Sequence, residues 1–287
     1  ATNAFLVGGL EPASQREAYT TAIATASALI AEAAQNQPAD GAALGGQFEV
    51  NTYTTSGQRY PAVAADSAGN FVVVWDSFGS AGTDRSSFSI QAQRFAANDA
   101  ALGAQFQVNT YTTAAQRYPS VAVDGAGRFV VVWQSYGQDG SHYSVRGQRF
   151  SAAGAPAGFE FQVNSFTTGP QRDPSVAMND AGDFVVAWQS ESSSGPDADA
   201  YSVQLQRFRA DGSPDGGESQ VNSWTTGHQG SAGVAADGQG NFLVVWDSSG
   251  SSGTDADSAS IQAQRYDALF RDGFESSDTT RWSASVP

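Results

Sequence analysis

The sequence predicts an all-β fold, a four-bladed β-propeller whose blades are four-stranded antiparallel sheets. Two observations support this prediction. An apolar strand that ends in tryptophan recurs at spacings of 58, 55 and 58 residues. Each repeat also contains four segments with the apolar or alternating character of a β-strand. Four strands in a unit of this length are typical of a propeller blade, because solenoids normally use shorter repeats.

Three series of residues keep the register of the repeat. The apolar strands read FVVVW at 71–75, FVVVW at 129–133, FVVAW at 184–188 and FLVVW at 242–246. Gln-Arg pairs stand in alternating strands at 93–94, 148–149, 206–207 and 264–265. Val-Asn pairs stand at 50–51, 108–109, 163–164 and 221–222. A tight turn before each apolar strand is predicted at Asp66, Asp124, Asn179 and Asp237, because each of these residues precedes a glycine by three positions.

The two ends of the repeat array are offset by one strand. The array begins with a lone fourth-strand segment, 48–52, and it finishes on a third-strand segment, 260–266. Pairing the two would remove both exposed strand edges. We therefore expect an N-terminal strand near Val50 to close the ring by pairing with the strand through Gln262. An open array completed by a neighbour's strand is the alternative.

Two segments lie outside the expected propeller at 41–267. Residues 1–40 form an N-terminal extension with a predicted helix at 12–36, which Ser14 and Glu17 would cap. Residues 268–287 form a polar C-terminal tail. The apolar stripe of the helix and the aromatic residues of the tail are candidate assembly contacts: Tyr19, Ile23, Leu29, Ile30, Phe274 and Trp282.

Composition excludes several partners. The formal net charge is −15, and all 14 basic residues are arginines, so phosphate backbones and anionic lipids would repel the chain. We therefore expect no nucleic-acid partner. No apolar run is long enough for membrane insertion. The single methionine is Met178 and the chain opens at Ala1, from which we expect an exported product that is secreted or held at the cell surface.

The repeat resembles an uncharacterised repeat of large secreted bacterial surface proteins. The matching residues are the glycine-FVVVW strand, the QRF strand at 93–95 and the Val-Asn-Thr element followed by QRYP at 116–119. The resemblance covers roughly 41–267, and it implies no defined activity. Separately, DGFES at 272–276 with Trp-Ser at 282–283 resembles a C-terminal segment of exported Gram-negative proteins, which implies export.

Catalytic and metal-binding patterns are weak. His142 and His228 stand in non-equivalent loops, cysteine is absent, and most acids recur at equivalent turn positions, so we predict no catalytic residues and no enzyme. Alternate carboxylates in the loops after the tryptophan strands could bind calcium, which prefers six to eight oxygen ligands. The candidate calcium ligands, with solvated loop acids as the alternative, are Asp197, Asp199, Asp255 and Asp257. No other cofactor is expected.

A repeated combination of aromatic, Gln and Arg residues suits sugar rings, which offer apolar faces edged by hydroxyl groups. Contacts between neighbouring blades are the alternative role for these residues. The candidate glycan-binding residues are Tyr53, Arg59, Tyr60, Tyr111, Arg117, Tyr118, Phe166, Arg172 and Trp224.

Three functional hypotheses follow from the sequence. The first is a non-catalytic extracellular structural or interaction protein: a self-assembling filament, coat or surface-layer subunit, or an adhesive one, present as a homo-oligomer or polymer. The second is a propeller lectin for an extracellular glycan. The third, an enzyme that hydrolyses an extracellular polymer, ranks last because no single active site is visible in the sequence. We expect the first.

Overall fold

The computed structural model describes residues 43, 45–80, 82–191, 197, 200–250 and 259–267. The chain divides into two compact units, residues 1–49 and 50–287, and every strand belongs to the second. The helix expected at 12–36 and all six candidate assembly contacts lie outside the described residues. Within the described part of the chain no helix is long and apolar enough to cross a membrane.

The strands form four antiparallel sheets in chain order, one for each repeat. The first sheet contains β1 (Gln58–Ala65), β2 (Phe71–Phe78), β3 (Phe88–Phe95) and β4 (Phe106–Gln107). The second contains β5 (Gln116–Val123), β6 (Phe129–Tyr136), β7 (Tyr143–Phe150) and β8 (Phe161–Gln162). The third contains β9 (Gln171–Met178), β10 (Phe184–Glu191), β11 (Tyr201–Phe208) and β12 (Ser219–Gln220). The fourth contains β13 (Gln229–Ala236), β14 (Phe242–Ser249) and β15 (Ala259–Tyr266). We call these sheets blades 1 to 4.

Each blade forms locally for the reasons that the sequence suggested. The turn between β1 and β2 is held by Asp66, whose Oδ1 accepts the main-chain N–H groups of Ala68 and Asn70, both at 2.9 Å. Gly69 in this turn has φ of 83°, which a glycine adopts without steric cost. The apolar strand after the equivalent turn of blade 2, β6, is buried on both faces, as its unbroken hydrophobic run predicts.

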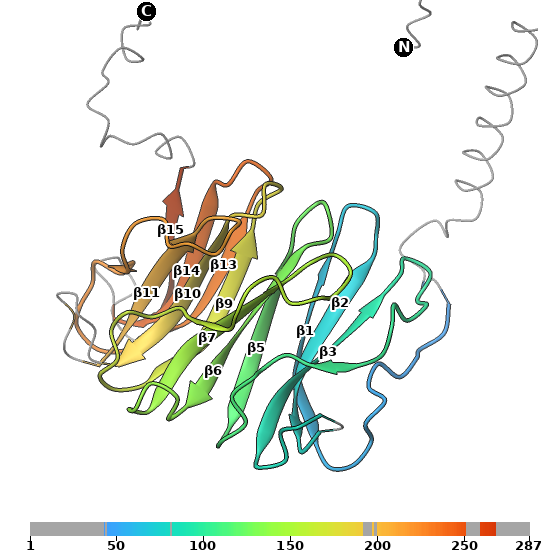
Figure 1. Cartoon of the computed structure of the whole chain (residues 1–287). Helices are drawn as coiled ribbons and strands as arrows, with labels where there is room; N and C mark the ends of the chain where they lie inside the picture. Colours follow the sequence, from blue (N-terminus) through green and yellow to red (C-terminus); the bar gives the residue numbers. More distant parts are fainter. Residues whose placement is uncertain are drawn as a thin grey trace, which may run out of the picture. The chain divides into compact units, whose positions relative to one another are not determined.

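The blades pack face to face, and Figure 1 shows them side by side in chain order. Between blades 1 and 2, Val72 and Val74 of β2 pack in one cluster with Val131 and Trp133 of β6. The first strands of the blades pack in succession, β1 with β5, β5 with β9 and β9 with β13. The prediction of an all-β propeller fold built from antiparallel blades is confirmed.

A buried asparagine completes the short fourth strand. Asn109 Oδ1 accepts the main-chain N–H of Ile90 at 2.8 Å, and its Nδ2 donates to the carbonyl of Tyr111 at 2.8 Å. In the next two blades Asn164 Oδ1 accepts the main-chain N–H of Val145, and Asn222 Oδ1 accepts that of Val203, both at 2.8 Å. The Val-Asn marker of the repeat is therefore a side-chain continuation of the sheet.

The expected closure of the ring is the part of the fold prediction that is wrong. Within the described residues blade 4 has three strands, and residues 48–52 are not in a strand. The N–H of Thr52 donates to Gln105 Oε1 of blade 1 at 2.8 Å, as Thr110 donates to Glu160 of blade 2. On β15, Ile261 is 77% exposed, whereas the equivalent Ile90 is fully buried. Blade 4 therefore ends without the pairing that was expected between the region of Val50 and the strand through Gln262.

Replacing Asn109 with alanine should lower the free energy of unfolding by about 2 kcal/mol, because it leaves the buried N–H of Ile90 without an acceptor. Asn98→Ala is the matched control: Asn98 is exposed and makes one 3.3 Å bond within its own turn, so this variant should change stability by less than about 0.5 kcal/mol. Urea denaturation measures both. Equal losses in the two variants would contradict the role given to Asn109.

Candidate functional site

Each first strand is interrupted by a β-bulge near its start, between the second and fifth residues of the strand. One non-glycine residue in each bulge has a left-handed backbone, with φ near 50°. Non-glycine residues in this conformation cluster at functional sites. The four residues are Tyr60 (51°), Tyr118 (52°), Asp173 (50°) and Ser231 (51°).

Side chains of the preceding blade hold two of these bulges in place. Gln134, directly after the tryptophan of β6, accepts the main-chain N–H of Asp173 at 3.1 Å through its Oε1. Gln189, in the same position on β10, accepts the N–H of Ser231 at 3.3 Å. The residue that follows each strand tryptophan therefore positions the bulge of the next blade.

Between blades 1 and 2 this position is an ion pair. Asp76 is fully buried, and its Oδ2 accepts a hydrogen bond from Arg117 Nε at 3.2 Å. The Arg117 guanidinium also lies 4.3 Å from the ring centroid of Phe88 and 5.0 Å from that of Tyr118. The rings of Tyr118 and Tyr60 lie 4.3 Å apart, with their hydroxyl oxygens 3.4 Å from each other.

Asp173 breaks the chemical pattern of the four bulges by placing a carboxyl group there. Its Oδ2 accepts a hydrogen bond from Gln189 Nε2 at 2.6 Å. Burial raises the pKa of Asp173, and the charge of Arg172 opposes this shift. The pKa of Tyr118 is raised by its hydrogen bond to Tyr60, by burial and in part by the charge of Asp173, so these groups share one electrostatic environment.

Several buried polar atoms at the bulges have no hydrogen-bond partner among the described residues. Burial raises the pKa of Asp76, although Arg117 opposes the shift, and Asp76 Oδ1 is without a partner. Arg172 Nε is also unpaired, while its guanidinium lies 5.2 Å from the ring centroid of Tyr143. Asp247 Oδ1 on β14 is the third such atom. Buried groups with unused hydrogen-bonding capacity are suited to a polar ligand.

We call the residues that meet around these bulges the bulge cluster. They supply two carboxyl groups, two guanidinium groups, two amides and two phenol rings. The members are Tyr60, Asp76, Arg117, Tyr118, Gln134, Arg172, Asp173 and Gln189.

The structure brings part of the expected glycan site to these bulges. Tyr60, Arg117, Tyr118 and Arg172 belong to the bulge cluster, and Arg59 pairs with Asp76 in the register of β1 and β2. The other aromatic candidates lie in the loops that lead into the first strands, where an asparagine Nδ2 donates to each main-chain carbonyl. These candidates are Tyr53, Tyr111, Phe166 and Trp224.

Sequence reasoning missed four members of the cluster: Asp76, Gln134, Asp173 and Gln189. The signal that could have found three of them is their shared position directly after a strand tryptophan. Asp173 could have been found as the acidic exception where blades 1 and 2 carry tyrosine in the Gln-Arg-Tyr-Pro element.

The calcium candidate that the structure describes is part of a buried network. Asp197 is buried, and its Oδ2 accepts a hydrogen bond from Asn222 Nδ2 at 2.8 Å. The equivalent Asp84 accepts from Asn109 at 3.1 Å. No group of three metal-ligating side chains occurs within the described residues. The remaining candidates, Asp199, Asp255 and Asp257, lie outside those residues.

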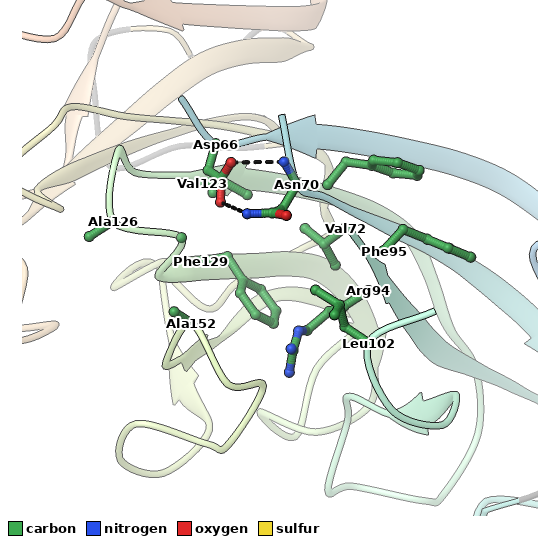
Figure 2. A pocket seen from close by; sticks show the side chains of 12 residues that line it. Asp66, Asn70, Val72, Arg94, Phe95, Leu102, Val123, Ala126, Phe129 and Ala152 are labelled. Atoms are coloured by element: carbon green, nitrogen blue, oxygen red, sulfur yellow. Dashed lines mark hydrogen bonds between the residues drawn. The ribbon is translucent and has the colours of Figure 1, made fainter. Parts of the chain in front are cut away.

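A cavity of about 150 Å³ lies between blades 1 and 2 at the opposite end of the first strands from the bulges. Figure 2 shows Arg94 beside Leu102 at this cavity, with Asp66 and Asn70 joined by two hydrogen bonds. Burial lowers the pKa of Arg94. The rest of the lining is mostly apolar, and it offers few polar groups that could act on a substrate.

Comparison with known proteins places the fold. A family model described as an actinobacterial sensor domain matches residues 1–56. No curated protein matches the chain. Among solved structures, an α-L-arabinofuranosidase from Fusarium graminearum in complex with an iminosugar inhibitor is 12% identical, with 75% of this chain and 64% of that chain covered and a TM-score of 0.51. An endo-arabinase from Bacteroides thetaiotaomicron is 14% identical, with 77% and 79% covered and a TM-score of 0.44.

These likenesses show a propeller fold that the matched glycoside hydrolases share. The expectation of a non-enzymatic filament, coat, surface-layer or adhesive subunit is corrected on this ground, because the solved structures that match with TM-scores of 0.51 and 0.50 are α-L-arabinofuranosidases. That expectation rested in part on the lack of a visible active site, since most acids recur at equivalent turn positions. Asp173 is not equivalent to its counterparts, which are Tyr60, Tyr118 and Ser231.

Asp173→Asn should flatten the dependence of stability on pH. The pKa of Asp173 is higher in the folded than in the unfolded protein, so ionisation of Asp173 destabilises the fold. The free energy of unfolding of the native protein should therefore fall as the pH rises from about 4 through the folded-state pKa. The variant keeps an acceptor for Gln189 and should melt at an equal or higher temperature at pH 7.

Thermal melts from pH 4 to pH 8 test this sign. Asp211→Asn is the opposite control, because hydrogen bonds from Ser213 lower the pKa of Asp211. Removing that carboxylate should reduce stability above pH 4. The quantity to compare is the melting temperature of Asp173→Asn minus that of the native protein. If this difference is smaller at pH 7 than at pH 4, the assignment is contradicted.

Proposed function

We propose that the chain is a carbohydrate-active enzyme that binds a glycan at the bulge cluster and hydrolyses a glycosidic bond. The observation that carries this proposal is the carboxyl group of Asp173, which stands at a left-handed bulge, has a raised pKa and lies in the electrostatic environment of Tyr118. The fold shared with an α-L-arabinofuranosidase bound to an iminosugar inhibitor supports a sugar as the ligand.

The proposed binding chemistry follows from the side chains. Tyr60 and Tyr118 offer ring faces for the apolar side of a sugar and hydroxyl groups for its edge. Tyr60 is 45% exposed, so a ligand can reach this pair from solvent. Arg172 carries an unused guanidinium Nε, which would donate to a sugar oxygen.

The proposed chemistry uses two carboxyl groups in different protonation states. Asp173, with its raised pKa, donates a proton to the leaving glycosidic oxygen as the bond from that oxygen to the anomeric carbon breaks. A water molecule forms the new bond to the anomeric carbon and gives its proton to a carboxylate. We assign that second role to Asp76, whose ion pair with Arg117 opposes the burial that raises its pKa.

We also propose that the enzyme acts outside the cell. The support is the resemblance of the repeat to those of large secreted bacterial surface proteins and of the DGFES segment at 272–276 to that of exported Gram-negative proteins. The strongly acidic, lysine-free composition suits a neutral or cationic polysaccharide better than an anionic one.

Asp173→Asn should reduce kcat on a cleaved polysaccharide by about 10²–10⁴-fold, the usual contribution of a general acid, while KM changes little. The native rate should fall as pH rises above the raised pKa of Asp173, because the proton to be donated is then lost. The substrates are arabinan and xylan, with a sialylated glycan as the anionic comparison that should be cleaved least. Reducing sugar is the readout, and a glycan array measures binding separately.

Two further variants complete the design. Tyr118→Phe should weaken glycan binding, because it removes a hydroxyl group of the aromatic pair. Arg209→Ala is the matched control, since Arg209 is exposed and pairs only with Asp215 in its own loop. Binding without turnover would reduce the proposal to a lectin. If the native protein neither binds nor cleaves any of these glycans, the proposed function is wrong.

A further inference from the structure

On the outer faces of blades 1 and 4, apolar residues are exposed whose equivalents are buried where two blades meet. On blade 1, Val63 is 65% exposed, although the equivalent residues Val121 and Val176 are buried against the preceding blade. On blade 4, Leu243 and Ile261 are exposed where their equivalents face the next blade. The two faces are therefore the two halves of one junction.

The same two faces carry opposite charges in the arrangement of an existing contact. At the junction of blades 1 and 2, Asp76 follows the tryptophan and accepts a hydrogen bond from Arg117 of the next blade. Asp247 occupies the Asp76 position on blade 4, and Arg59 occupies the Arg117 position on blade 1.

The intervening junctions do not repeat this pair of charges. They combine Gln134 with Arg172, and Gln189 with Gly230. Asp247 Oδ1 is buried and has no hydrogen-bond partner among the described residues, and the same holds for Oδ1 of the equivalent Asp76. An aspartate and an arginine thus stand at matching positions only where blade 1 meets blade 2 and at the two ends of the array.

We infer that the outer face of blade 4 docks on the outer face of blade 1 of a second copy of this chain, head to tail. Asp247 of one copy then pairs with Arg59 of the other, and Leu243 and Ile261 cover Val63. The occupant is a second copy because Figure 1 shows blades 1 and 4 at opposite ends of the row, with packing from β1 to β5 to β9 to β13. This contact is heterologous, since each copy uses two different faces.

The inference goes beyond the proposed enzyme because the contact assembles a second group of bulge residues. Tyr60 of the second copy follows Arg59 just as Tyr118 follows Arg117. Tyr60 of the second copy would therefore lie beside Asp247, just as Tyr118 lies beside the ion pair of Asp76 and Arg117.

Cysteine cross-linking tests the contact directly, because the chain contains no cysteine. Asp247→Cys and Arg59→Cys are prepared separately, mixed at equal concentration and oxidised. A disulfide-linked pair of twice the chain mass is expected in the mixture, well above the level in either variant alone. The control for background is Phe159→Cys, whose position is 95% exposed and outside both faces. The control for geometry is the double variant Asp76→Cys/Arg117→Cys, which should cross-link within one chain.

A second measurement does not depend on cysteine. Sedimentation should show at least a tenfold weaker association for Asp247→Arg and for Arg59→Asp. An equimolar mixture of the two should associate as strongly as the native protein, because each contact in the mixture again joins an acid to an arginine. Circular dichroism confirms that both remain folded. Cross-linking no greater than the Phe159→Cys background would overturn the inference. The inference would also be overturned if the double variant Arg59→Cys/Asp247→Cys formed its disulfide only within a single chain.

Discussion

The contact between neighbouring blades is the interaction on which the rest of the structure depends. Each blade is a thin sheet with apolar residues on both faces, so it is stable only when neighbours cover them. Trp133 and Trp188 are fully buried in these contacts, and burial of a large apolar side chain contributes about 1.5–3 kcal/mol. The same requirement leaves the outer faces of blades 1 and 4 apolar and uncovered.

The candidate site is a consequence of that contact. A bulge with a left-handed residue exposes a main-chain N–H that the sheet cannot satisfy, and the polar residue after the tryptophan of the preceding blade accepts it. Because each bulge is fixed by a different blade, chemical groups from three repeats converge. Repetition supplies the scaffold, and one departure from repetition, Asp173, places a carboxyl group at a bulge.

Much of the fold was readable because its determinants are local. The apolar strand, the aspartate turn and the Val-Asn marker recur in the sequence, and each forms its hydrogen bonds within one blade, as Asp66 and Asn109 do. The ring closure was predicted wrongly because pairing between the ends of the array depends on the summed geometry of three blade junctions. The site was only partly predicted, because Arg117 and Tyr118 stand out in the repeat whereas Asp76 looks like the start of a loop.

The sequence by itself determined the repeat, the strands and the chemical identity of each marker, because side-chain period and turn chemistry act over a few residues. Only the tertiary structure decided which markers meet. Asp76 and Arg117 stand 41 positions apart, and Gln134 and Asp173 stand 39 apart, so their pairing depends on the face-to-face stacking of blades. Burial in that stacking also raises the pKa values of Asp76 and Asp173, which no property of the isolated residues specifies.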